Sequence, residues 1–164
     1  MSGQSQSTSG DPGSSGLGGG ESSSAVAKTF TIKQANAALP LVRAITSDLA
    51  ALSREVTERR QRLAALVARR ERSAGDIYSD ELRQIEEELE KDTDRLREFV
   101  EELRQLGVEP KGGPEGVIAT VDFPGIVDGR LVYLCWRLGE SEVQFWHDLD
   151  TGFAGRRPLA GAEL

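Results

Sequence analysis

Two apolar runs with the same heptad spacing limit what this chain can fold into. In each run the large apolar residues recur at alternating steps of four and three, the spacing of a coiled-coil seam. The first run comprises Ile45, Leu49, Leu52, Val56, Leu63 and Leu66, and the second Leu82, Ile85, Leu89, Leu96, Phe99, Leu103 and Leu106. Between them Ser73-Ala74-Gly75-Asp76 predicts a turn. Residues 30–107 are therefore predicted to form a long antiparallel two-helix coiled-coil hairpin.

One charged residue interrupts each seam, Arg59 in the first run and Asp92 in the second. Folding the chain at the turn brings these two positions opposite each other. A paired charge in an apolar seam fixes the register more than it adds stability, because desolvation offsets much of the attraction. Arg59 and Asp92 are therefore predicted to form a structural ion pair.

The two predicted helices carry opposite net charge. Seven arginines and three glutamates give residues 54–72 a net charge of +4, whereas eleven acids and four bases give residues 80–102 a net charge of −7. We interpret the first run as a basic helix beside its acidic partner, the alternative being a basic patch for nucleic acid. The net charge of the whole chain, −7, argues against a nucleic-acid partner.

The composition outside the predicted helices indicates which residues fold and in which compartment the protein is expected. Residues 1–28 are mostly Ser and Gly and are predicted to form a disordered tail, and residues 160–164 a flexible end. Cys135 is the single cysteine, which fits a reducing compartment. No stretch approaches the roughly 20 apolar residues that cross a membrane. We expect a cytoplasmic protein with no membrane partner.

The start of the first helix has a recognisable signal. Thr31 and Gln34 have the spacing of a capping box, and Phe30 precedes them as a staple residue. Pro40 is predicted to lie in the first turn of the long helix, after a short helical lead-in, because a missing N–H donor costs little there.

After Gly107 the apolar period changes from seven to two. This predicts a three-stranded antiparallel β-meander within residues 116–148, with strands at 117–123, 131–138 and 143–147. Asp128-Gly129 and Gly139-Glu140 are predicted two-residue turns, and Pro124-Gly125 offers an alternative bulge in the first pairing. The predicted fold class is α+β, with the hairpin packed at its base on the meander. A Gly/Arg loop at 149–159 completes a single domain, residues 29–159.

The two turns assign the strand residues to faces. Leu134, Trp136, Phe145 and His147 fall on an apolar face that packs on the hairpin. The opposite face is the candidate binding surface and comprises Asp122, Tyr133, Cys135, Arg137, Gln144 and Trp146. The alternative is that the C-terminal segment folds across this face and buries it.

The candidate metal ligands in this region are Cys135, Glu140, His147 and Asp148. The predicted register places Cys135 and His147 on opposite faces, which favours a packing role for His147 over a metal site. Cys135 also lacks a general base on its own face. The sequence therefore predicts no catalytic residue, no metal and no cofactor.

Arg156 and Arg157 lie beside glycines and are the candidate anion-binding residues, because paired guanidinium groups bind phosphate or carboxylate through bidentate hydrogen bonds. The alternative is that they hold the loop to Asp148, Asp150 or the acidic helix.

Several motifs resemble a bacterial family known as domain of unknown function 2203. They are Ala35-Asn36-Ala37-Ala38-Leu39-Pro40, Asp122-Phe123-Pro124, Leu134-Cys135-Trp136-Arg137-Leu138-Gly139-Glu140, Phe145-Trp146-His147 and Gly152-Phe153-Ala154-Gly155-Arg156-Arg157-Pro158-Leu159. The resemblance covers about residues 29–159. It implies domain limits, and it brings no established activity or cofactor.

The favoured hypothesis is a non-enzymatic protein-interaction module that self-associates, as a homodimer or with a protein partner, through the helical hairpin. The alternative hypothesis is a protein that binds a small anionic ligand or a metal, with or without enzymatic activity. It would use the C-terminal rim of His147, Asp148 and the two arginines.

Overall fold

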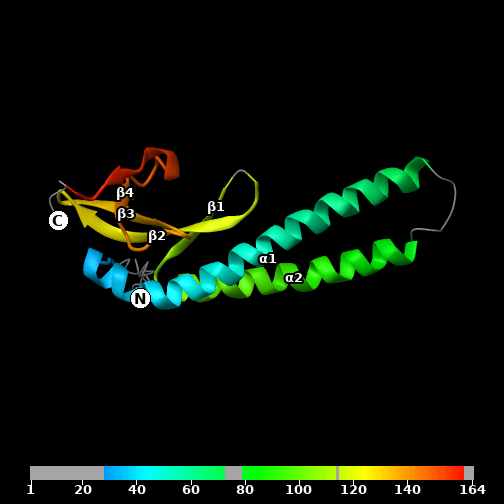
Figure 1. Ribbon diagram of the computed structural model, residues 1–164, viewed down its shortest axis with the longest axis horizontal. Helices are drawn as coiled ribbons and strands as arrows, with labels where there is room; N and C mark the ends of the chain where they lie inside the picture. The colour runs from blue at the N-terminus through cyan, green and yellow to red at the C-terminus, as the bar shows by residue number, and fades with distance from the viewer. Residues whose placement is uncertain (1–27, 73–78, 114, 161–164) are drawn as a thin grey trace, which may run out of the picture.

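The computed structural model describes residues 28–72, 79–113 and 115–160. Within these ranges two long helices, α1 (Ile32–Arg72) and α2 (Ser79–Gln105), form an antiparallel hairpin, and a five-stranded sheet packs against one end of it (Figure 1). The α+β class is thus confirmed. Residues 1–27 of the predicted tail, the turn at residues 73–76 and the end beyond residue 160 lie outside the described residues. Neither of the described helices combines the length and apolar character that a membrane crossing requires.

The predicted capping box begins α1. Gln34 N–H donates to Thr31 Oγ1 at 3.1 Å, and Thr31 N–H donates to Gln34 Oε1 at 3.0 Å. Phe30, just before the cap, is buried, and its ring meets that of Phe123 edge-to-face with centroids 5.3 Å apart. The helix start is therefore fixed both by its own cap and by the sheet.

Pro40 departs from the prediction, because it lies inside one continuous helix instead of at the start of a second one. Its side chain is exposed, whereas Leu39 and Val42 beside it are buried in the core. Core contacts on both sides of the proline keep the helix continuous and offset the backbone hydrogen bond that proline removes.

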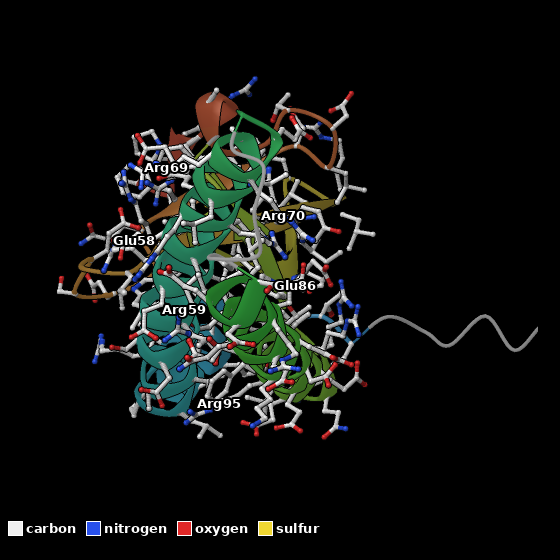
Figure 2. The ribbon with its side chains drawn as sticks, turned by 90° about the vertical axis from the view of Figure 1, so that its right-hand side faces the viewer. Glu58, Arg59, Arg69, Arg70, Glu86 and Arg95 are labelled. Carbon is white, nitrogen blue, oxygen red and sulfur yellow. The ribbon has the colours of Figure 1, made fainter. Side chains whose placement is uncertain are left out.

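The ion pair expected in the seam is present. Arg59 Nη1 donates to Asp92 Oδ2, and Arg59 Nε lies 3.7 Å from Glu88 Oε2. Figure 2 views the hairpin along its length from the far end, with Arg59 labelled, and shows that many charged side chains surround the two helices. Beyond this pair, Leu66 packs with Leu82 and Ile85 in a small second core. The antiparallel register is therefore held by apolar contacts on both sides of a charged pair.

Asp92→Leu should change the free energy of unfolding by less than about 1 kcal/mol, because a partly exposed ion pair contributes little. The side chain of Arg59 is 35% exposed and keeps Glu88 as a partner. Denaturant unfolding checks this, with Asp94→Leu, in a more exposed pair with Arg97, as the control. A loss of several kcal/mol in Asp92→Leu alone would contradict the expectation.

The sheet of the described region has five strands where three were predicted. In spatial order they are β1 (Glu109–Gly112), β2 (Ile118–Val127), β3 (Arg130–Arg137), β4 (Phe145–His147) and β5 (Arg157–Pro158), and each pairs antiparallel with its neighbours. The two additional strands, β1 and β5, form the edges. Both contain proline and lack apolar alternation, which only an edge strand tolerates, and so no period-two signal marked them.

The turn at Asp128-Gly129 joins β2 to β3 as predicted. Both residues have positive φ, 51° and 74°, as a primed two-residue turn requires. Asp122 pairs with Cys135, the predicted register. The alternative bulge at Pro124-Gly125 does not form, because the ladder continues through both residues. Gly125 permits this, since a Cβ there would come within 2.9 Å of the Leu134 side chain.

The register between β3 and β4 was predicted wrongly by one residue. Tyr133 pairs with His147 instead of Trp146, because a longer loop replaces the expected turn at Gly139-Glu140. Side chains alternate between faces along a strand, so this shift exchanges the two faces of β4. His147 therefore lies on the same face as Cys135, and Trp146 lies in the core.

One local and one long-range hydrogen bond hold that loop, residues 138–144. The Trp136 indole N–H donates to Glu140 O at 3.0 Å, and Val143 N–H donates to Asn36 Oδ1 of α1 at 2.7 Å. Asn36 and Val143 are 107 positions apart in sequence. The helix packed beneath the loop therefore helps to shape it, together with a local turn in which Glu140 N–H donates to Arg137 O at 3.0 Å.

One face of the sheet covers the hairpin and forms the main core. Its buried members include Leu39, Val42, Leu49 and Leu103 from the helices and Val121, Phe123, Leu134, Trp136 and Trp146 from the sheet. Ser53 of α1 adds a polar contact, its Oγ accepting a hydrogen bond from Ile118 N–H at 3.0 Å. The opposite face of the central strands is left to carry polar side chains.

Candidate metal centre

Three adjacent strands bring an aspartate, a cysteine and a histidine together on the face opposite the core. Asp122 comes from β2, Cys135 from β3 and His147 from β4, and one ligand atom of each lies within 4.8 Å of the others. The three residues are 1%, 0% and 2% exposed. Nitrogen, sulfur and oxygen donors thus converge in a buried place.

The His147 ring is oriented by two oxygen atoms. Its Nδ1 lies 2.7 Å from the backbone carbonyl of Asp148, and its Nε2 lies 3.0 Å from Asp122 Oδ1. A carbonyl oxygen only accepts, so Nδ1 carries a proton and donates it. This arrangement is the one commonly found around metal-binding histidines, where the second ring nitrogen donates to a carbonyl and fixes the ring.

The short contact between Nε2 and Asp122 Oδ1 is then favourable only if a proton or a cation lies between the two atoms. With Nδ1 protonated, a neutral ring presents a lone pair at Nε2, and a carboxylate also presents lone pairs. The two atoms attract each other when a proton lies between them or when a cation binds both. Because Asp122 is almost fully buried, its charge also requires such a partner.

Cys135 is a neutral thiol in the absence of a cation. Burial, with the nearby negative charge of Asp122 adding to it, raises the pKa of the Cys135 thiol from 9.0 to about 12, and the positive charge of Arg156 opposes this only in part. A thiol that stays protonated at neutral pH is a poor nucleophile, so a nucleophilic role for Cys135 is disfavoured. A bound metal cation reverses this preference and favours the thiolate.

Native metal-free protein should therefore react with iodoacetamide at Cys135 at least about a hundredfold more slowly at pH 8 than the unfolded chain. Because the pKa is raised, the rate should continue to rise above about pH 11, where an ordinary thiol has reached its plateau. Mass spectrometry of the alkylated chain measures both rates. A native rate equal to the unfolded rate would contradict the expectation.

A cleft of about 790 Å³ lies over this cluster, with Asp122 and His147 among the residues that line it. Its walls come from Arg54 of α1, the end of β1 and the segment after β4. Three protein donors, two of them lining a cleft, resemble zinc sites that keep a position open for water or substrate, whereas structural sites have four protein ligands.

The chain matches the model of one family, described as uncharacterized conserved protein (DUF2203), over residues 28–159. It belongs to the DUF2203 family. No match was found among curated proteins or among solved structures.

Four of the six residues of the candidate binding surface lie together in this DUF2203 protein. Asp122, Tyr133, Cys135 and Arg137 share the face opposite the core. Trp146 does not belong to it, because the shifted register buries that ring in the core. Gln144 lies in the preceding loop, where its side chain donates to Glu142.

The two candidate anion-binding arginines do not meet. Arg156 Nη2 lies 2.5 Å from Glu140 Oε1 and 3.3 Å from Cys135 O, with its guanidinium over the rings of Phe145 and Phe153. Arg157 lies over the Trp146 ring and reaches Asp148 at 3.9 Å. The contact with Asp148 is one that the sequence analysis weighed as the alternative to anion binding.

Of the four sequence candidates for metal ligation, Cys135 and His147 come together and the two acids do not join them. Glu140 binds Arg156, and the carboxylate of Asp148 faces Arg130 at 3.3 Å. Asp122 takes their place, a residue that the sequence analysis had placed on the binding surface. Its pairing with Cys135 followed from the Asp128-Gly129 turn, so the signal was available in the sequence.

Proposed function

We propose that this DUF2203 protein binds a divalent transition-metal ion of the Zn²⁺ type through Asp122, Cys135 and His147. The observation that carries the proposal is the environment of His147: Nδ1 donates to a backbone carbonyl, and Nε2 faces Asp122 Oδ1 at 3.0 Å. The Cys135 sulfur completes the donor set within 4.8 Å.

The charges of the cluster fit such an ion. A divalent cation bound by one carboxylate, one thiolate and a neutral imidazole gives a centre with no net charge, which a buried position favours. The donor set combines a soft thiolate with imidazole and carboxylate, which suits Zn²⁺ and Co²⁺ better than Mg²⁺ or Ca²⁺. The ion would supply Lewis acidity at the floor of the cleft.

The test is metal binding by the full chain. Native mass spectrometry of protein purified without chelator should show one metal per chain, and Co²⁺ added to metal-free protein should produce the near-ultraviolet band of a cobalt thiolate. Cys135→Ser should remove this band, whereas Tyr133→Phe, which removes one hydroxyl from the same face and keeps the ring beside His147, should retain it. Equal spectra for the wild type and Cys135→Ser would refute the proposal.

A second candidate role is protein interaction through the hairpin, as a homodimer or with another protein. It is favoured by the far half of the hairpin, which extends beyond the sheet (Figure 1). The seam residues Leu66 and Ile85 are already buried within the chain, and charged side chains such as Arg69, Arg70 and Glu86 surround the far end (Figure 2). A partner would therefore contact charged surfaces, and its binding should weaken with salt.

Sedimentation velocity at low and high salt tests this role. A dimer at low salt that dissociates at high salt, and that the double change Arg69→Glu, Arg70→Glu prevents, would support self-association. A monomer at all salt concentrations would exclude it and leave the metal proposal unaffected.

A further inference from the structure

The cleft over the metal cluster is lined by three exposed cationic side chains from three elements. Arg54 comes from α1, Lys111 from β1 and Arg137 from the end of β3. Their convergence depends on tertiary structure, since α1 and β3 are far apart in the sequence. The charged side chains along the hairpin differ in this respect, because their positions follow from the helical repeat alone.

These three cations lack ion-pair partners in the part of the chain that the structure describes. No carboxylate of the described residues lies within 4 Å of any of the three, although nearby Arg130, Arg156 and Arg157 all have one. Lys111 and Arg137 instead lie over the rings of Tyr133 and Phe153, at 5.7 Å and 5.5 Å. Contacts with aromatic rings hold these side chains in place and leave their hydrogen-bond donors free for a ligand.

The acids of the cleft do not cancel this charge. Asp122 lies on the floor, where the proposed metal ion would neutralise it, and Glu115 and Asp150 are both exposed. With the ion in place, three cations face two carboxylates in the cleft. An incoming ligand therefore meets an excess of positive charge.

The remaining lining suits an organic molecule. Tyr133, Phe153, Val117 and Leu149 supply aromatic and aliphatic surface, and a volume of about 790 Å³ lies within the usual range for small-molecule sites. Apolar walls with a few convergent charged groups are typical of sites that bind small organic anions.

We infer that the cleft binds a small organic anion, whose carboxylate or phosphate group contacts Arg137, Lys111 and Arg54. One oxygen of the ligand occupies the open position of the metal ion, so the inference rests on the proposed metal site. The ligand class is thus an anion with at least two oxygen atoms and a modest apolar body.

The experiment uses the full chain loaded with one equivalent of Co²⁺, whose visible spectrum reports on the open position. Inorganic phosphate and benzoate are titrated separately at constant ionic strength. At least one of the two anions should change the visible spectrum, and the change should saturate as its concentration rises. Arg137→Gln and Lys111→Gln should each weaken the apparent affinity about tenfold, as the loss of a charge-assisted hydrogen bond does.

Arg97→Gln is the matched control, because it removes the same charge from an exposed position on α2, away from the cleft. Its affinity for the anions should equal that of the wild type. An equal loss in Arg97→Gln would indicate general charge attraction and overturn the inference. A normal cobalt spectrum that neither anion changes would overturn it while leaving the metal site intact. Failure to bind cobalt would overturn the metal proposal itself.

Discussion

His147→Ala should lower the free energy of unfolding of the metal-free protein by about 3–5 kcal/mol, because removing His147 leaves the buried carboxylate of Asp122 without its partner. Asp122 is 1% exposed and has the imidazole 3.0 Å from its Oδ1. Without the ring, the carboxylate must either stay charged without that partner or take up a proton. Denaturant unfolding in the presence of a chelator measures the loss.

The control is the double variant Asp122→Asn, His147→Gln, which replaces the pair by two neutral groups of similar size. Most of the lost stability should return, since no isolated charge remains in the buried cluster. Zn²⁺ should raise the melting temperature of the wild type and leave His147→Ala unchanged. A loss below about 1 kcal/mol in His147→Ala would mean that Asp122 has another adequate partner.

The helical hairpin could be predicted because its information is local and repeated. The heptad pattern predicts which residues of each helix face the other helix. One charged residue in each run, Arg59 and Asp92, then sets the register of the two helices. The failure at Pro40 has a different origin. Buried Leu39 and Val42 keep the helix continuous, and that burial depends on a sheet formed later in the chain.

The sheet shows where local rules stop. The Asp128-Gly129 turn fixed the register of β2 with β3, since its backbone angles are encoded by the two residues themselves. The next connection depends on the Val143 N–H bond to Asn36, a contact between distant parts of the chain. A prediction based on Gly139-Glu140 therefore missed the register by one residue.

This one-residue error decided how the candidate site was interpreted. In the predicted register His147 faced the core and a metal site was disfavoured, whereas the observed register places it beside Cys135 and Asp122. Cys135 and His147 were candidate ligands in the sequence, whereas Asp122 was expected only on the binding surface. The tertiary contact that sets the register of β4 with β3 could not be predicted from the sequence. The family match does not reveal that contact either.

Trp136→Ala should lower the free energy of unfolding by about 3–5 kcal/mol, as for other large-to-small changes of a buried aromatic residue. The indole is fully buried in the main core, and its N–H donates to Glu140 O at 3.0 Å. The substitution therefore leaves a cavity and also releases the loop that sets the β4 register. Denaturant unfolding followed by circular dichroism gives the loss.

Trp136→Phe separates these two effects. The phenyl ring fills most of the space, so the loss should be about 1–2 kcal/mol, but the hydrogen bond to Glu140 disappears. If that bond holds β4 in phase, the cobalt spectrum of the folded variant should weaken, because His147 loses its fixed position relative to Cys135. The exposed Gln144→Ala, in the same loop, should leave both readouts unchanged. A Trp136→Phe variant with the wild-type spectrum would show that the contact of Val143 with Asn36 suffices to fix the register.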